Sequence, residues 1–346
     1  MADGGRRAHI GSFTAAGGPG IVTAAVGADG ALTALSTLDG LPDPSYLALA
    51  ADGRTLYAVS ETDEGAVAAL RVTGDGLEPA GGPVPVAASG PTHLGLFDGH
   101  LLTANYGSGS LTAVPVRPDG TLARSASGVL RHSGSGPHPQ RQQGPHTHQV
   151  QADPAGRWAV AVDLGTDSVL VCALADGAPV LHRETALRPG SGPRHLAFHP
   201  DGRHAYVLNE LSPTLLACRW DADAGVLQPL IEIPVLPGAP AGDAYPSGLA
   251  VSPDGRRLWT ATRGEDVLSV FSLDAETGGG RDKPRLLATV PCGGRWPRAL
   301  TEADGVLYVA NERSGDVTWF PTDPDTGLPR RGGSLPVPAA SCVVMR

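Results

Sequence analysis

Histidine, arginine and glutamate side chains recur at two corresponding positions along this chain, and together they could carry out acid–base chemistry on an anionic molecule. The first position opens each of a series of similar segments and supplies His93, His146, His148, Arg194, His195, Trp296 and Arg298. The second lies later in each segment and supplies Glu61, Asn105, Tyr106, Asp163, Asn209, Glu210, Arg263, Asn311, Glu312 and Arg313. Imidazole and carboxylate groups exchange protons near neutral pH, and guanidinium groups bind phosphate or carboxylate.

The segments that carry these residues are copies of one repeat. The clearest copy, GPRHLAFHPDGRHAYVLNELSPTLLACRW (192–220), returns as YPSGLAVSPDGRRLWTATRGEDVLSVFSL (245–273) and as WPRALTEADGVLYVANERSGDVTWF (296–320). Looser copies occupy 44–70, 91–114 and 145–174. A period of roughly 40–55 residues with several strands in each copy is typical of propeller blades.

One copy shows how a blade is built. Short β-forming runs at 195–198, 205–208, 214–220 and 226–233 predict four strands. Asp201 and Gly202 predict a hairpin turn after the first of them, because these residue types tolerate the left-handed backbone conformation. Four short antiparallel strands separated by turns make one propeller blade.

The two ends of the chain supply a seventh blade. The N-terminal runs 8–14, 20–26 and 31–37 resemble strands two to four of a copy, and 336–345 resembles the proline and first strand. We therefore predict an all-β, seven-bladed propeller that forms a single domain over residues 1–346, closed by the C-terminal strand. The alternative is a six-bladed ring with two terminal flaps.

The composition bounds the function. The net charge is −9 without a basic cluster, which argues against nucleic-acid or acidic-membrane partners. No apolar stretch has signal-peptide or transmembrane length, so we expect a cytoplasmic protein. Lys283 is the single lysine, which disfavours Schiff-base chemistry and a P-loop, and no cofactor is expected. Four widely spaced cysteines suggest buried apolar residues, the alternative being a disulfide or zinc site.

The repeat brings the two positions together. In an antiparallel blade the start of strand one and the end of strand two lie at the same edge, so all blades deliver these residues to one face of the ring. Convergent ionisable groups in a concavity suggest an active site. Two structural alternatives compete with this interpretation. Asp163 and Asn311 could bond their own turns, and glutamate–arginine pairs could be plain salt bridges.

The motifs resemble those of the lactonase family of seven-bladed propellers. They are HIGSFT (9–14), GPHPQRQQGPHTHQVQADP (136–154), VDLGTDSV (162–169), GPRHLAFHPDGRHAYVLNE (192–210) and RWPRAL (295–300). This family includes propeller-type 6-phosphogluconolactonases and fungal carboxy-muconate lactonizing enzymes. The resemblance implies active-site roles for His148, Arg194, Glu210 and Arg263, a further basic position at Arg298, and no metal. His138, Arg141, Gln142 and His146 resemble a motif of one bacterial branch.

These observations favour a lactone hydrolase that acts on 6-phosphogluconolactone or a related sugar lactone without a metal. His148 is the expected base, Glu210 would orient it or the water, and Arg194 would stabilise the oxyanion. Arg263 and Arg298 would clamp the anionic substrate. Further substrate contacts are expected from His146, Arg141, Asn105, Asp163, Glu61 and Glu312. Arginines around Glu210 should lower its pKa and weaken it as a base.

Three other functions fit the same residues. The first is a lactonizing cycloisomerase that acts on a muconate-type dicarboxylate. The second is a non-catalytic propeller that binds a protein or an anionic ligand. The third is a calcium-dependent lactonase, which would use Glu61, Asp163, Glu210 and Glu312.

A last prediction concerns the long irregular stretch 122–144. Its end, around 131–148, should form a flap beside the site, the alternative being a disordered insertion.

Overall fold

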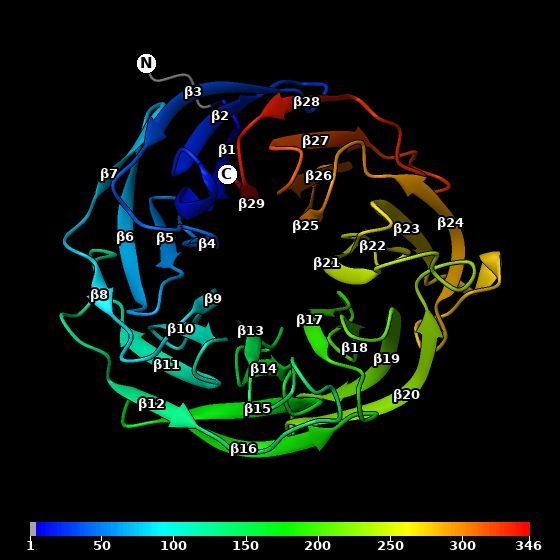
Figure 1. Ribbon diagram of the computed structural model, residues 1–346, viewed down its shortest axis with the longest axis horizontal. Coiled ribbons are helices and arrows are strands. Elements are labelled where there is room, and N and C mark those ends of the chain that lie inside the picture. The colour runs from blue at the N-terminus through cyan, green and yellow to red at the C-terminus, as the bar shows by residue number, and fades with distance from the viewer. Residues whose placement is uncertain (1–4) are drawn as a thin grey trace.

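The computed structural model describes residues 5–346, which form seven antiparallel sheets arranged in a closed ring (Figure 1). Blade 1 contains strands from both ends of the chain: β29 (Ala340–Met345), β1 (Arg7–Ser12), β2 (Ile21–Val26) and β3 (Leu32–Leu38). In Figure 1 the red β29 lies beside the blue β1 at the inner side of this blade. The predicted closure is therefore confirmed.

The other six blades follow in chain order, each from its inner to its outer strand (Figure 1). Blade 2 contains β4 (Leu47–Leu49), β5 (Thr55–Ser60), β6 (Ala66–Thr73) and β7 (Gly76–Pro79), and β8 (Val84–Pro85) also pairs with β6. Blade 3 contains β9 (Pro91–Phe97), β10 (His100–Asn105), β11 (Ser110–Pro115) and β12 (Gly128–Arg131). Blade 4 contains β13 (Thr147–Ala152), β14 (Ala159–Asp163), β15 (Ser168–Ala175) and β16 (Ala178–Ala186).

Blade 5 contains β17 (Pro193–Phe198), β18 (His204–Asn209), β19 (Thr214–Asp221) and β20 (Val226–Pro234), in agreement with the four strands predicted there. Blade 6 contains β21 (Tyr245–Val251), β22 (Arg257–Arg263), β23 (Val267–Ser272) and β24 (Arg285–Pro291). Blade 7 contains β25 (Pro297–Ala303), β26 (Val306–Asn311), β27 (Asp316–Pro321) and β28 (Gly333–Pro336). Two short 3₁₀ turns, η1 (Thr14–Ala16) and η2 (Ala275–Thr277), were not predicted.

The core lies between neighbouring blades, where apolar side chains of one sheet pack against the next. Tyr206 and Leu208 of blade 5 share a buried cluster with Phe271 of blade 6, and equivalent clusters join the other blades. The four cysteines are buried and free, as expected for small apolar residues. Within 5–346 no helix has both the length and the apolar character needed to cross a bilayer.

The stretch 122–144 is less irregular than predicted. It contains β12, the outer strand of blade 3, whose backbone pairs with β11. The sequence does not show this strand because GVLR is short and lies between serine- and glycine-rich runs. Its position leaves residues 132–146 as the segment that leads back to the centre of the ring.

Candidate active site

A repeated β-bulge at the start of the inner strand aims the first set of site residues. In blade 5, Pro193 pairs with Asn209 and His195 pairs with Leu208, so Arg194 is an extra residue with no partner on β18. The same irregularity makes His148 the extra residue in blade 4 and Arg298 the extra residue in blade 7. A bulge bends the strand and re-aims the side chain of the extra residue. The same kind of β-bulge therefore sets the direction of all three side chains.

The second set follows the end of strand two and is held by its backbone. The N–H of the first residue after this strand donates to the carbonyl of a residue just before strand one, with N···O distances of 2.7–3.1 Å. The donors are Glu61, Tyr106, Leu164, Glu210 and Glu312, and the respective acceptors are Asp43, Gly90, His146, Gly192 and Trp296. These bonds fix the two predicted positions of blades 2, 3, 4, 5 and 7 against each other at one face.

Glu210 is the centre of this face. Its Oε1 accepts a hydrogen bond from Arg141 Nη2 at 2.6 Å, and its Oε2 lies 3.0 Å from Arg194 Nε and 2.7 Å from Arg263 Nη2. Only 3 % of the Glu210 side chain is exposed. The structure thus gathers three arginines from blade 5, blade 6 and the segment before blade 4 around one buried carboxylate. We call Glu210, Arg141, Arg194 and Arg263 the arginine cluster.

The arginine cluster sets the protonation of Glu210. Burial alone would raise the pKa of this carboxyl, but Arg263, Arg194 and Arg141 lower it to about 2. Glu210 is therefore ionised at neutral pH and is a weak base, as the sequence predicted.

His148 lies among aromatic rings beside the arginine cluster. Its ring centroid is 5.4 Å from that of His195 and 5.7 Å from that of Tyr106. Burial lowers the pKa of His148 well below its ordinary value, and Arg194 and Arg298 lower it further. The imidazole is thus neutral at pH 7, and the same burial and positive charges make it a weaker proton acceptor than a free histidine. Its Nδ1 is buried without a hydrogen-bond partner.

A second group of charged side chains at this face contains more negative than positive residues. Arg298 Nη1 donates to Glu312 Oε2 at 3.1 Å, and its Nη2 lies 3.9 Å from Glu61 Oε1. The Arg298 guanidinium also lies over the Phe13 ring, 4.6 Å from its centroid. We call Glu61, Arg298 and Glu312 the glutamate cluster. It joins blades 7 and 2 across blade 1 and has more carboxylates than guanidiniums.

The segment 132–146 contributes to the same face. Arg141 Nε donates to the Tyr106 hydroxyl at 3.2 Å, and the His146 ring stacks on the Tyr106 ring with centroids 4.4 Å apart. His146 Nδ1 also lies 2.8 Å from the Tyr106 carbonyl oxygen. These contacts place the stretch beside the predicted residues Tyr106 and Glu210, and its role as a flap over a substrate stays a prediction.

Asn105 and Asp163 are the last residues of strand two, as Arg263 is, but their side chains form hydrogen bonds within their own blades. Both side chains are fully buried. Asn105 Nδ2 donates to Ser110 and Thr112, within its own blade. Asp163 accepts from the His146 N–H and the Thr147 hydroxyl, each at 2.9 Å. That they contact a substrate stays a prediction, and the structure gives each a framework role.

Sequence reasoning placed His195 and Trp296 at the first recurring position but assigned neither of them a role in the reaction. His195 was assigned to a strand, yet its Nε2 lies 3.2 Å from Arg194 Nη1, and the same arginine nitrogen donates to the Ser247 carbonyl. The bulge explains this omission, since two successive side chains cannot face one site in a regular strand. Adjacent arginine and histidine after a proline were the available signal.

Trp296 is strained and borders the arginine cluster. Its φ of 63° lies in the left-handed region, where the same position holds Gly90 and Gly192 in other blades. Such a conformation is costly for a bulky residue and often marks functional sites. The Arg313 guanidinium lies 3.4 Å from the Trp296 ring centroid and that of Arg263 lies 5.5 Å away. A hollow of about 490 Å³ adjoins this ring, between blades 6 and 7.

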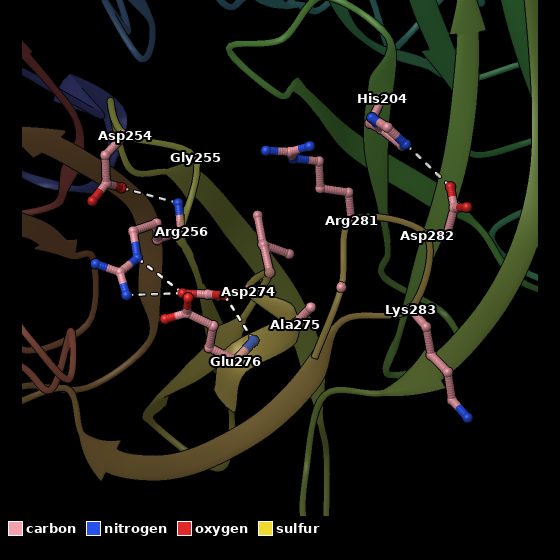
Figure 2. A pocket seen from close by; sticks show the side chains of 12 residues that line it. His204, Asp254, Gly255, Arg256, Asp274, Ala275, Glu276, Arg281, Asp282 and Lys283 are labelled. Atoms are coloured by element: carbon pink, nitrogen blue, oxygen red, sulfur yellow. Dashed lines mark hydrogen bonds and ion pairs between the residues drawn. The ribbon is translucent and has the colours of Figure 1, made fainter. Parts of the chain in front are cut away.

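A larger pocket of about 810 Å³ lies at the opposite face, among the hairpin turns of blades 5 and 6 (Figure 2). Four of its lining residues form two pairs: Arg256 with Asp274 at 2.8 Å, and His204 Nε2 with Asp282 at 3.1 Å. Nearby, His199, Asp201 and His204 have ligand atoms within 4.8 Å of one another. His199 Nε2 already contacts the Gly255 carbonyl and His204 bridges two aspartates, so these groups act as an inter-blade tie.

Fold and site together define a closed seven-bladed propeller whose central face gathers buried arginine, glutamate and histidine side chains. The chain belongs to the lactonase family of seven-bladed β-propellers, whose description, "Lactonase, 7-bladed beta-propeller", matches residues 7–345. It is 32 % identical over 343 residues to a 6-phosphogluconolactonase of Bacillus subtilis, with 97 % of each chain covered. Among solved structures it resembles the periplasmic gluconolactonase PpgL of Pseudomonas aeruginosa (TM-score 0.90, 31 % identity, 98 % of each chain). A protein from Lactobacillus plantarum is similar (TM-score 0.91, 27 % identity, 99 % of each chain).

The buried histidines predict acid sensitivity. Burial lowers the pKa of His93 to about 3 and that of His9 to about 4, from 6.5 in both cases. The unfolded chain therefore binds these protons first, so stability is full above pH 6.5 and falls as the pH drops toward 4. Each histidine should remove roughly 1.4 kcal/mol per pH unit in this window. Urea unfolding at pH 7.5, 6.5 and 5.5 measures the slope. His93→Gln should reduce the dependence of stability on pH without abolishing it, because His9 still contributes. An unchanged slope in this variant would contradict the assignment.

Proposed function

We propose that this protein hydrolyses a sugar lactone, most favourably 6-phosphogluconolactone, by acid–base catalysis at the face described above. The observation that carries the proposal is a neutral His148 beside three arginines that surround an ionised Glu210, in a chain of the lactonase family. Lactone opening needs a proton acceptor for water and positive charge for the oxyanion that forms. Both are present within the arginine cluster and its neighbour His148.

In the proposed reaction His148 accepts a proton as the water oxygen adds to the lactone carbonyl carbon. Arg194 stabilises the negative charge on the carbonyl oxygen, and Glu210 orients the water. The ring C–O bond then breaks, and the departing ring oxygen takes the proton from His148. The product is the open hydroxy acid, so the reaction consumes one water and leaves the enzyme unchanged.

The proposed roles of the arginine cluster and the glutamate cluster follow from their net charges. Arg263 belongs to a group with excess positive charge, which supports its proposed role as an anion clamp. Arg298 is already neutralised by two carboxylates, so we propose that the glutamate cluster instead binds sugar hydroxyl groups. Carboxylate oxygens are strong acceptors for such donors.

The test is a lactone panel with and without a chelator. We expect hydrolysis of phosphorylated aldonolactones with a higher kcat/KM than of unphosphorylated ones, and no loss with EDTA. The reason is that guanidinium contacts to Glu61, Glu210 and Glu312 disfavour a cation at this face. Rates are corrected for spontaneous hydrolysis without enzyme. Loss with EDTA and recovery with calcium would support a metal lactonase, and absence of turnover would support a lactonizing or binding protein.

A further inference from the structure

The three arginines around Glu210 are not equally fixed. Arg194 and Arg263 lie on strands, with 3 % and 8 % of their side chains exposed. Arg194 also donates to the Ser247 carbonyl, and Arg263 Nε donates to the Tyr245 carbonyl at 3.2 Å. These two guanidiniums are held from both sides and cannot leave Glu210 without disturbing the blades.

Arg141 is the movable member of the arginine cluster. It lies on the irregular segment 132–146, its side chain is 35 % exposed, and it alone contacts Glu210 Oε1. The adjoining backbone, in contrast, is anchored by Gln142, which is buried. Gln142 Oε1 accepts from the His138 N–H at 3.0 Å, and its Nε2 donates to the Leu164 carbonyl at 2.8 Å. The other partner of the Arg141 guanidinium is the Tyr106 hydroxyl, which accepts from Arg141 Nε at 3.2 Å. Because the Arg141 side chain is partly exposed, it can leave both partners while the segment stays in place.

The arginine cluster is built for an additional anion. Three guanidiniums and one carboxylate give it a net charge of +2. Arg194 Nε and Arg263 Nη2 share one oxygen, Glu210 Oε2, in ion pairs of 3.0 and 2.7 Å, and neither of these two buried nitrogens forms a hydrogen bond of good geometry. Buried donors of this kind are costly unless an acceptor reaches them. A dianion matches the charge of the arginine cluster, whereas the glutamate cluster, with a net charge of −1, would repel it.

We propose that Arg141 is a displaceable latch on Glu210, which the phosphate monoester of the lactone substrate pulls away and so frees Oε1 for the attacking water. This inference rests on the proposed function. In the free protein both carboxylate oxygens of Glu210 are covered by guanidiniums. The bound phosphate takes Arg141 as its partner, and Glu210 Oε1 accepts a hydrogen bond from the water. The same dianion offsets the arginine charges that face His148, which makes this imidazole a better proton acceptor.

With such a latch, the phosphate group of the substrate both contributes to binding and activates the enzyme. An unphosphorylated lactone should therefore be hydrolysed faster when a separate dianion is supplied. The probes are glucono-lactone and inorganic phosphite, assayed at constant ionic strength with the enzyme-free rate at each phosphite concentration subtracted. We expect phosphite to raise kcat/KM by a factor within the roughly 5- to 150-fold range of coupled binding.

Arg141→Ala separates the latch from a simple binding role. Without the latch, unphosphorylated lactone should be hydrolysed faster than by the wild type, and phosphite should give no further activation. Calorimetry should show weaker phosphite binding to this variant. Gln140→Ala, a change at an exposed neighbour on the same segment, is the matched control and should behave as the wild type.

The outcomes are distinct. If wild-type protein hydrolyses 6-phosphogluconolactone but phosphite leaves the glucono-lactone rate unchanged, the latch is wrong and the proposed function stands. The latch is also wrong if Arg141→Ala is slower on unphosphorylated lactone or is still activated by phosphite. If the wild type hydrolyses neither lactone, the proposed function fails and the inference fails with it.

Discussion

Replacement of Arg194 by alanine should lower kcat for lactone hydrolysis by roughly two to three orders of magnitude while the protein stays folded. Arg194 is the bulge residue of blade 5, is almost fully buried and contacts Glu210 and the Ser247 carbonyl. Removal of a preorganised oxyanion donor costs roughly 3–4 kcal/mol of transition-state stabilisation. The measurement is steady-state kinetics on the phosphorylated lactone, with circular dichroism and thermal melting to confirm the fold.

Two further variants sharpen this expectation. Arg194→Lys keeps the charge but loses the planar fork that reaches Glu210 and the carbonyl together, so it should recover little activity. Arg219→Ala is the matched control. This arginine lies on the same blade, but it is exposed and pairs with Asp282 at 2.6 Å near the opposite face. A rate near that of the wild type for Arg194→Ala would remove the oxyanion role.

The three central residues should also act as a unit. Arg194 contacts Glu210 directly, and its charge lowers the pKa of His148. Residues that cooperate in one step show non-additive losses. Double variants that combine Arg194→Ala with His148→Ala or Glu210→Gln should therefore be little slower than the worse single variant. Additive losses would show that the three groups serve separate steps.

The sequence predicts the fold more completely than the site. The reason is that the residue types of a repeat mark its strands and turns but do not mark its β-bulges. Prolines, Asp-Gly turns and alternating apolar runs mark strands directly, so the blades and the closure by 340–345 could be found. A β-bulge leaves no such mark. The sequence gives His195 and Arg194 as neighbours in a strand, and only the pairing of Pro193 with Asn209 shows that both can face the centre.

The sequence also does not show whether a polar residue is the last residue of a strand or the first residue of the turn that follows. Asn105 was predicted to contact substrate and Glu210 to take part in catalysis, although the first ends its strand and the second follows its strand. In these two blades one residue of difference turns the side chain from the blade interior to the centre of the ring. Arg263 departs from this rule, because it ends β22 and still contacts Glu210. The arginines around Glu210 come from separate segments, at 141, 194 and 263, so their convergence on one carboxylate depends on the three-dimensional arrangement of the blades.

Deletion of the last ten residues, 337–346, should abolish cooperative unfolding of the whole ring. These residues form β29, which pairs with β1 from Ala8↔Met345 to Ser12↔Ala340 and buries Ala340, Cys342 and Val343. The Val343 carbonyl also accepts a hydrogen bond from the Thr301 hydroxyl of blade 7, at 2.8 Å. Burial of each larger apolar side chain contributes roughly 1.5–3 kcal/mol, and a whole domain is stable by only about 5–15 kcal/mol. Loss of the strand also exposes the edge of β1, which favours aggregation.

A complementation experiment separates loss of closure from general damage to the chain. The truncated protein is mixed with a synthetic peptide of residues 337–346, which can add to the free edge of β1 as a strand. We expect the peptide to restore a cooperative melting transition, and a peptide with the same residues in scrambled order to have no effect. The native order matters because alternate side chains of β29 must face the buried cluster that joins blades 7, 1 and 2. A truncated chain that melts cooperatively without peptide would show that the other blades hold the ring together without β29.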